Sequence, residues 1–371
     1  MIISVAVVIG FKHSVSEKVM GFAAHVQLVL FDNNFGAQGN PLVVDDELLN
    51  QLKANEKIGH VQRVAQKAGV IKTKDQILGV ILKGVGTDFD NTFLFDNIQE
   101  GTYPKISDKE TTDEILISEK ISKKLNISVG DFARMWFIDE GQSRARGRKF
   151  TVSGIYNTGM EEIDNLYIIG DLKHIQKLNN WNDKEVGSVE LILNDITDIN
   201  NTTFELYTTI PYNIRAISVY EEYPQIFNWL NLLDMNVVVI LTLLILVSTI
   251  TMISTLLILI IERTSMVGLL KALGSNNSSI RKIFLYKASG IIFKGMLWGN
   301  IIGVLFYFVQ LYTKFISLSA ESYYVDYVPV ELHLSDVLLL NMGTFIVSFL
   351  VLVIPTYYIT RVVPAKALRY E

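Results

Sequence analysis

Three long stretches in the second half of the chain contain no charged side chain. They cover residues 235–261, 295–313 and 337–360. Each is close to or above the ~20 helical residues that cross the hydrocarbon core of a bilayer. A soluble amphipathic helix would show charges on one face every ~3.6 residues, and none occur over several turns. The pattern predicts transmembrane helices at about 234–261, 288–313 and 337–360.

The opening stretch, residues 1–11, is apolar but only half as long as a spanning helix. A secretory signal peptide is the competing interpretation. No basic segment precedes the apolar run, and Lys12, His13 and Lys18 follow it without a small-residue cleavage site. We therefore expect residues 1–11 to be part of a first transmembrane helix that starts upstream of Met1.

The region between these apolar segments, residues 12–225, mixes strand and helix patterns. Runs rich in β-branched residues predict strands at 25–31, 77–82, 114–117, 132–138, 149–156, 165–169, 188–193 and 214–219. Helical spacing predicts helices at 45–54, 118–125 and 171–178. Many strands are closer in sequence than a helical crossover permits, which favours an antiparallel sheet. The predicted fold class is a membrane protein with four transmembrane α-helices, the first truncated, and a large extracytoplasmic α+β domain.

Charge is distributed unevenly, and it sets the predicted orientation. Residues 1–261 carry −9 and residues 262–371 carry +4. Short cytoplasmic loops retain Lys and Arg, so residues 262–287 and the tail 361–371 are expected in the cytoplasm. The acidic loop 314–336 and the domain 12–225 are then outside, and the multi-pass protein is placed in a bacterial inner membrane with its large domain in the periplasm.

The sequence contains few candidates for catalytic or metal-binding residues. The chain has no cysteine, and its five histidines, which show no metal-ligand spacing, are His13, His25, His60, His174 and His333. It lacks a GxxxxGK[ST] phosphate loop, so it is not expected to hydrolyse ATP. The net charge of −5 argues against nucleic-acid binding. We expect a non-enzymatic chain without a metal, and without a cofactor of its own.

A short cytoplasmic segment carries more information. Met266, Leu269, Leu270 and Leu273 recur at helical spacing, and Gly274 stands where a helix would end. By periodicity alone, a helix lying in the lipid interface is slightly favoured over one that docks on a protein.

Sequence resemblance favours docking. The string ERTSMVGLLKALGSNNSSIRKIF at 262–284 and the ending PAKALRYE at 364–371 resemble signatures of the FtsX/MacB superfamily of ABC-transporter membrane subunits. Within it the chain is most similar to lipoprotein-releasing (Lol-type) permeases, through Gly10-Phe11, Ala24-His25-Val26 and YYVDYVPV at 323–330.

The resemblance implies a division into a partial first helix at 1–11, a periplasmic core at 12–225 and an FtsX-like permease domain at 226–371. It also implies that a coupling helix, about 262–282, docks on a separate cytoplasmic ATPase that binds the ATP. The residues expected to form this contact are Glu262, Arg263, Met266, Val267, Gly268, Leu269, Leu270, Lys271, Leu273 and Gly274. Further expected partners are a second permease subunit, identical or different, and a lipoprotein substrate.

Two other groups of residues are candidates for contacts. A Lol subunit that recruits a periplasmic lipoprotein carrier has a proline-bearing hook, but the matching place here has no proline. The basic residues there, which are candidates for an external partner or else a solvated hairpin tip, are Arg144, Arg146, Arg148 and Lys149. Gly295, Gly299 and Gly303 repeat at every fourth residue, and we expect them to pack against the last helix near Gly343, with a contact between subunits as the alternative.

The expected function is extraction of lipoproteins from the inner membrane towards the outer membrane, driven by the partner ATPase. Two alternatives stay open: a MacB-type efflux or mechanotransmission permease, and an FtsX-type regulator of a cell-wall hydrolase that transports nothing. Sequence alone leaves open the substrate, the direction, the type of dimer, the residues before Met1 and the binding of a carrier.

Overall fold

The computed structural model describes residues 1–31, 40–73, 76–137, 145–319 and 323–357, and the chain divides into two units. The helical unit contains Met1–His13, Asn228–Ser317 and the described residues from Tyr327 to Tyr357. The sheet unit contains Ser14–Phe227 and the described part of Leu318–Asp326. The chain thus passes four times from one unit to the other, twice within a continuous helix.

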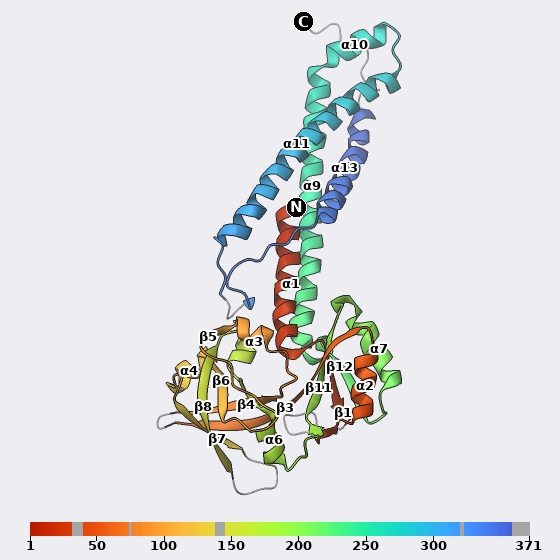
Figure 1. Cartoon of the computed structure of the whole chain (residues 1–371). Helices are drawn as coiled ribbons and strands as arrows, with labels where there is room; N and C mark the ends of the chain where they lie inside the picture. The colour runs from red at the N-terminus through yellow and green to blue at the C-terminus, as the bar shows by residue number, and fades with distance from the viewer. Residues whose placement is uncertain (32–39, 74–75, 138–144, 320–322, 358–371) are drawn as a thin grey trace. The chain divides into compact units, whose positions relative to one another are not determined.

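Three described helices are long and apolar enough to cross a membrane (Figure 1). They are α9 (Pro224–Glu262), α11 (Asn277–Thr313) and α13 (Leu334–Thr356). Their presence confirms the three predicted spans. Two of them begin about ten residues earlier than expected, because a charge-free run marks only the apolar part of a longer helix.

Helix α1 (Ile2–Ala23) has 22 residues and corrects the prediction that the first helix ends at residue 11. It continues through Lys12 and Lys18 to Ala24, whose φ of +62° ends the helical geometry. Burial of Val15 and Val19 explains why the helix persists beyond its apolar start. Among the described residues, α1 is not one of the helices apolar enough to count as a membrane span.

The helical unit has an apolar cluster where α9, α10 (Thr264–Ala272), α11 and α13 meet. Its buried members are Leu256, Ile260, Val267, Ile280, Phe284, Ala288, Ile292 and Leu352. A polar pair adds to this packing, since the Asn300 and Asn341 amides each donate a hydrogen bond to the other, at 2.7 and 3.0 Å. Such side-chain bonds between helices are worth roughly 1 kcal/mol in a membrane.

The sheet unit is built on one ten-stranded sheet and a two-stranded one (Figure 1). The large sheet contains β1 (Val26–Leu30), β3 (Ile58–Lys72), β4 (Ile77–Val85), β5 (Ile98–Gly101), β6 (Glu114–Ser118), β7 (Phe132–Phe137), β8 (Arg146–Tyr156), β9 (Tyr167–Asp171), β11 (Ser188–Leu193) and β12 (Ile214–Ser218). The small sheet pairs β2 (Leu42–Val43) with β10 (Glu185–Val186). Among the described strands, only the β4–β9 and β6–β8 pairs are parallel, which confirms a largely antiparallel sheet.

Six strands close into a ring, in the order β3, β4, β9, β6, β8, β7 and back to β3. Closure is possible because the 15-residue β3 pairs with β11 along its first half and with β7 near its end. Met135, Phe137 and Phe150 are fully buried among these strands. A Cβ at Gly69 would lie 2.6 Å from the Met135 Cε, so a larger residue here would have to displace the end of that buried side chain.

Short helices cover the sheet, and several of them begin at polar caps. Asp45, Ser118 and Asp171 each accept a backbone N–H from the first turn of the helix that follows. The helices are α2 (Asp46–Ala54), α3 (Thr92–Asp96), α4 (Glu119–Leu125), α5 (Glu161–Asp164), α6 (Leu172–Asn179), α7 (Ile199–Thr209) and α8 (Val219–Glu222). The helices expected at 45–54, 118–125 and 171–178 are therefore confirmed.

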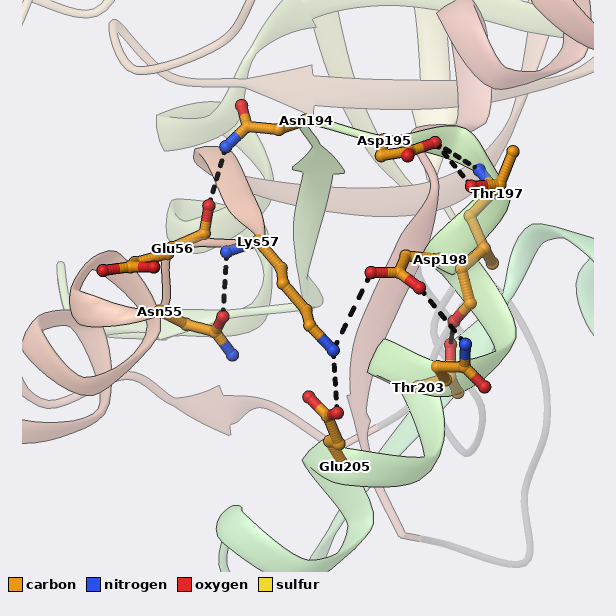
Figure 2. A network of polar contacts seen from close by, with 11 residues as sticks. Asn55, Glu56, Lys57, Asn194, Asp195, Thr197, Asp198, Thr203 and Glu205 are labelled. Carbon is orange, nitrogen blue, oxygen red and sulfur yellow. Dashed lines mark hydrogen bonds and ion pairs between the residues drawn. The ribbon is translucent and has the colours of Figure 1, made fainter.

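The two longest elements of the sheet unit that were not predicted are β3 and α7. An exposed polar network links their ends (Figure 2). The Lys57 ammonium, just before β3, lies 2.7 Å from a Glu205 oxygen on α7, and the Asn194 amide donates to the Glu56 carbonyl at 2.8 Å. These contacts hold α7 beside the turn between α2 and β3, but exposed ion pairs contribute little stability.

Candidate functional site

Helix α10 occupies the place of the expected coupling helix, and a Schellman motif ends it. Gly274 has a φ of +89°, which favours glycine. Its N–H donates to the Lys271 carbonyl, and the Ser275 N–H donates to the Leu270 carbonyl, both at 3.0 Å. Gly274 therefore fixes the turn that leads from α10 into α11.

The apolar residues of α10 divide between two faces. Val267 is completely buried in the cluster shared with α11, and Leu270 packs against the same cluster. Met266, Leu269 and Leu273 are 39%, 52% and 75% exposed, and their spacing of three and four places them on one outward face. Leu270 was expected at the docking contact, but it is half-buried against this cluster, and its part in docking stays a prediction. Of the other predicted residues, Glu262, Arg263 and Gly274 are exposed, Lys271 is half-buried and Gly268 is buried.

The residues of the predicted basic cluster do not share one face of β8, because side chains alternate between the two faces of a strand. Lys149 lies opposite Arg134 on the outward face, where its ammonium is 3.4 Å from the centre of the exposed Phe132 ring. Arg146 and Arg148 lie opposite Phe137 and Met135, which are buried. Arg144 and the rest of the hook position, 139–143, lie outside the described residues.

Arg134 and Trp136 were missed by the sequence analysis, although period-two alternation would have found them. Trp136 faces Gly147 across the hairpin, and a Cβ at Gly147 would lie 3.0 Å from its ring. The outward face of β7 and β8 therefore carries two cations and two aromatic rings, Arg134, Lys149, Phe132 and Trp136.

The glycine repeat on α11 does not pack as expected. A Cβ at Gly295 or Gly299 would meet no atom within 4 Å, and the same is true of Gly343 on α13. Gly303 instead faces α1, with its Cβ position 3.4 Å from Ile2. A contact between subunits at Gly295 and Gly299 stays a prediction.

Gly295 borders a cavity of about 410 Å³ among α9, α11 and α13. Hydroxyl groups occur on its α9 wall, but Thr251 donates to the Val247 carbonyl and Thr255 to the Thr251 carbonyl. These hydroxyls are therefore satisfied within their own helix, and the cavity is apolar.

A buried charged network lies where α1 ends and α9 begins. The Lys83 ammonium on β4 lies 2.8 Å from a Glu190 oxygen on β11, and their side chains are 1% and 2% exposed. Lys83 also donates to the Phe22 carbonyl in the last turn of α1 at 2.7 Å, and the Gln62 amide donates to Glu190 at 2.7 Å. Burial, and then the Glu190 charge, raise the pKa of Glu222 at the end of α8 to about 7, while Lys83 opposes the shift.

Sequence reasoning missed this network, but a signal was present. Lys83 and Glu190 are each the single charged residue inside an apolar strand. A charge in such a strand is costly unless it is paired, so each one indicates a partner elsewhere in the fold.

Two family profiles together match most of the chain. The MacB-like periplasmic core domain matches residues 1–208, more than half of the chain, and the FtsX-like permease C-terminal domain matches residues 238–364. The chain belongs to the FtsX/MacB superfamily of permeases. In this permease the helical unit carries the FtsX-like part, and the sheet unit is the periplasmic core, so it is an inner-membrane protein with a periplasmic domain.

Curated relatives of the permease extend over its full length. The lipoprotein-releasing system transmembrane protein LolC of Xylella fastidiosa is 23% identical and covers 100% of this chain and 90% of its own. LolE of Haemophilus influenzae is 20% identical, with 99% and 90% covered. The similarity to Lol-type permeases expected from the sequence is thereby confirmed.

Two solved structures with similarity to the permease are an extracellular domain and a periplasmic region. The extracellular domain of the ABC-type transporter YknZ gives a TM-score of 0.35 at 15% identity, covering 52% of this chain and 99% of its own. The periplasmic region of MacB from Actinobacillus actinomycetemcomitans gives 0.37 at 14% identity, with 57% and 97% covered.

Among the described residues of the permease, no group of three or more His, Asp or Glu side chains is placed so that it could hold a metal ion. His13 and His333 each lie beside a different oxygen of the Glu331 carboxylate. The distances are 3.2 Å from His13 Nδ1 to Oε2 and 3.2 Å from His333 Nε2 to Oε1. His25 accepts the Leu193 N–H through Nδ1, and burial lowers its pKa, so this histidine is a neutral core residue.

Proposed function

We propose that this chain is the non-catalytic membrane subunit of an ABC-type complex that extracts triacylated lipoproteins from the inner membrane for transfer to the outer membrane. The observation that carries the proposal is the full-length similarity to proteins named for lipoprotein release. Transfer of three acyl chains into water would cost tens of kcal/mol, at about 0.8 kcal/mol per methylene. The subunit must therefore offer apolar surface to its substrate, and its membrane helices are rich in it.

The work of extraction comes from a separate cytoplasmic ATPase that docks on α10. Its contact surface on this chain is the outward face Met266, Leu269 and Leu273, with Arg263 at the edge. Three apolar side chains, each more than a third exposed and all on one helix face, support this assignment. ATP binds to the partner ATPase, and this chain provides no cofactor site of its own.

The full complex contains a second permease subunit, identical or homologous. In each subunit, α1 is the first membrane-spanning helix, so that each subunit has four spanning helices: α1, α9, α11 and α13. Support comes from contacts of α1 inside the helical unit: Ile2 lies beside Gly303, the Ala6 carbonyl accepts the Glu331 N–H at 2.9 Å, and Phe11 packs edge-on against Trp229.

A periplasmic lipoprotein carrier would meet the outward face of β7 and β8. The cations Arg134 and Lys149 beside the exposed Phe132 fit a partner surface that is acidic and partly apolar. Arg146 is a weaker candidate, because it lies near Lys67 on β3. Burial lowers the pKa of Lys67, and the charge of Arg146 lowers it further.

The test uses proteoliposomes that contain the permease, its ATPase and a triacylated lipoprotein. We expect ATP-dependent release of the acylated protein into the lumen or medium in the presence of an acceptor. The same protein with serine in place of its lipidated cysteine is the control and should leave ATP hydrolysis at its basal rate. Equal stimulation by both proteins without release would contradict lipoprotein extraction.

The two alternatives predict different outcomes in the same system. A MacB-type efflux permease would respond to a peptide or free lipid rather than to the acylated protein. An FtsX-type regulator would change the activity of an added cell-wall hydrolase and transport nothing. No contact among the described residues favours either of them over lipoprotein release.

A further inference from the structure

Lys18 joins three segments that are far apart in the sequence. It lies on α1, five residues before the end of that helix, and its side chain is half-buried. Its ammonium donates to the Thr158 carbonyl at 2.8 Å and to the Tyr324 carbonyl at 2.9 Å. Thr158 is in the loop between β8 and α5, and Tyr324 is in the connection between α11 and α13. One side chain thus bridges two loops that are 166 positions apart.

The Thr158 side of this bridge is held rigidly. Asp164, which is 1% exposed, accepts the Thr158 N–H and hydroxyl and the Gly159 N–H, at 2.9 to 3.2 Å. These bonds fix the loop backbone and point the Thr158 carbonyl at Lys18. Burial lowers the pKa of Lys18, and the carboxylates of Asp326 and Asp164 oppose this shift by attracting the ammonium.

The Tyr324 side is held in an unfavourable backbone conformation. Tyr324 has a φ of +62°, which a side chain other than glycine adopts at a cost of about 1–2 kcal/mol. Its hydroxyl donates to Glu162 at 2.7 Å, and the next residue, Val325, is buried. Such a conformation persists only where neighbouring contacts impose it, and here the contacts come from α5 and α1.

The described part of Leu318–Asp326, in the middle of the connection between α11 and α13, therefore belongs by its contacts to the sheet unit, although both ends of the connection and both flanking helices belong to the helical unit. On the helical side, Gln310 of α11 holds the two ends of the connection together, because its amide donates to the Val328 carbonyl at 2.8 Å and accepts the Ile316 N–H at 3.2 Å. A displacement of α11 or α13 must reach Tyr324 through this short, bonded segment.

We propose that Lys18 is a positioning residue that couples the connection between α11 and α13 to the periplasmic domain, so that movement of these membrane helices displaces the loop between β8 and α5. The proposal rests on the proposed function, since it assigns the path by which ATP-driven motion reaches the outer domain. Lys18 acts through the two carbonyl groups that it binds and touches no substrate.

The first experiment measures the connection directly and needs no ATPase. Because the chain has no cysteine, Glu161→Cys and Tyr323→Cys place two spin labels without any background. Both positions are exposed, one beside each end of the bridge. We expect a single narrow distance distribution with Lys18 present and a broad one in Lys18→Met. An equally narrow distribution in Lys18→Met would overturn the proposal.

The second experiment measures lipoprotein released per ATP hydrolysed in the reconstituted complex. Lys18→Met should keep basal hydrolysis but lower this ratio about tenfold, the factor that corresponds to losing one charged hydrogen bond of ~1.4 kcal/mol. Lys18→Arg should restore much of the ratio, because arginine can still donate to both carbonyls. The matched control is Lys12→Met, on the same helix as Lys18. It removes the exposed ion pair between Lys12 and Asp234 of α9 and should leave the ratio unchanged.

The outcomes separate the two proposals. A wild-type complex that hydrolyses ATP but releases no lipoprotein refutes the proposed function, whatever the spin labels show. A Lys18→Met complex with the wild-type ratio refutes the coupling role and leaves the proposed function intact. Parallel losses of expression, hydrolysis and release in Lys18→Met, without rescue by arginine, would mean that Lys18 is only structural and would also refute coupling.

Discussion

At the scale of single residues, the permease contains charges where a domain core is normally apolar. Lys83 and Glu190 are both fully buried, and each is satisfied by more than its partner, Lys83 by the Phe22 carbonyl and Glu190 by Gln62. A buried pair of this kind contributes little net stability, but loss of one member leaves an uncompensated charge. The network ties the last turn of α1 to two strands that are not adjacent in the sheet.

Lys83→Met should destabilise the sheet unit by about 3–5 kcal/mol, the usual cost of breaking a buried pair from one side. The double variant Lys83→Met with Glu190→Leu should be substantially more stable than Lys83→Met, because it removes both charges. Chemical unfolding of the full-length protein in detergent, followed by tryptophan fluorescence, provides the comparison. If the double variant is no more stable than the single one, the pair does not bury its charge as described.

Glu222 should make stability depend on pH. Its folded pKa of about 7 lies above the ordinary value of 4.5, so the folded protein retains a proton that the unfolded chain releases. The protonated state favours folding at low pH, and this contribution is lost as the pH rises from 4.5 through 7. Melting temperatures between pH 4.5 and 8 should fall more in wild type than in Glu222→Gln. Glu221→Gln, at the exposed neighbour, should behave like wild type.

At the scale of elements, α10 shows how one helix serves two surfaces. Val267 and Leu270 bind it to its own subunit, while Met266, Leu269 and Leu273 remain on the opposite face. In the sequence, all of these residues are apolar and recur at helical spacing. This spacing cannot say which face meets the partner, because that depends on where α11 lies.

Leu269→Asp should abolish association with the ATPase while the permease stays folded, because the charge is placed in an apolar contact that forms only in the complex. Leu270→Asp should instead reduce the amount of folded permease, since it enters the subunit's own cluster. Co-purification with the tagged ATPase and size-exclusion profiles distinguish the two effects. Normal ATPase association of folded Leu269→Asp would show that this face is not the docking surface.

The glycine repeat on α11 gives an element-scale prediction about assembly. Space around Gly299 is open in the subunit, so a leucine there meets no atom within 4 Å at its Cβ. Gly299→Leu should therefore yield a folded subunit, and any defect should appear in pairing of subunits, where small residues permit close helix approach. Multi-angle light scattering measures the oligomer, and Gly343→Leu, also in open space, is the matched control. An unfolded Gly299→Leu subunit would place the glycine inside a close intrasubunit contact after all.

At the scale of the whole molecule, the chain crosses between its two units inside α1, inside α9 and twice through the connection of α11 and α13. Two long helices and one bonded loop are therefore the covalent routes by which motion in the membrane can reach the periplasm. This arrangement suits a subunit that transmits work done by a separate ATPase.

The proposed fourth span is tested by cysteine labelling in intact membranes. Ile3→Cys should resist a membrane-impermeant maleimide added from the periplasmic side, because the start of α1 would lie among lipid and helices. Glu17→Cys, exposed and on the sheet-unit part of α1, should react. Permeabilised membranes provide the control for intrinsic reactivity. Rapid labelling of Ile3→Cys in intact membranes would show that α1 lies outside the bilayer.

Much of this architecture follows from the sequence by itself. Charge-free runs longer than a bilayer require helices at 235–261 and 337–360, because backbone groups in lipid must be satisfied within the segment. The strand and cap patterns give most of the sheet unit, and the string at 262–284 gives the superfamily. These features are local, so neighbouring residues in the chain determine them.

Tertiary structure alone decides the remainder, because it depends on which distant segments meet. The 15-residue β3 is half polar, and its strand conformation comes from pairing with β4, β7 and β11. Lys18 and Lys83 appear in the sequence as ordinary charges, and only the fold brings them to the Tyr324 carbonyl and to Glu190. The two faces of α10 likewise differ only in the folded chain, because α11 buries one of them and leaves the other exposed. A sequence specifies which groups need partners, and the packed chain specifies which partners they receive.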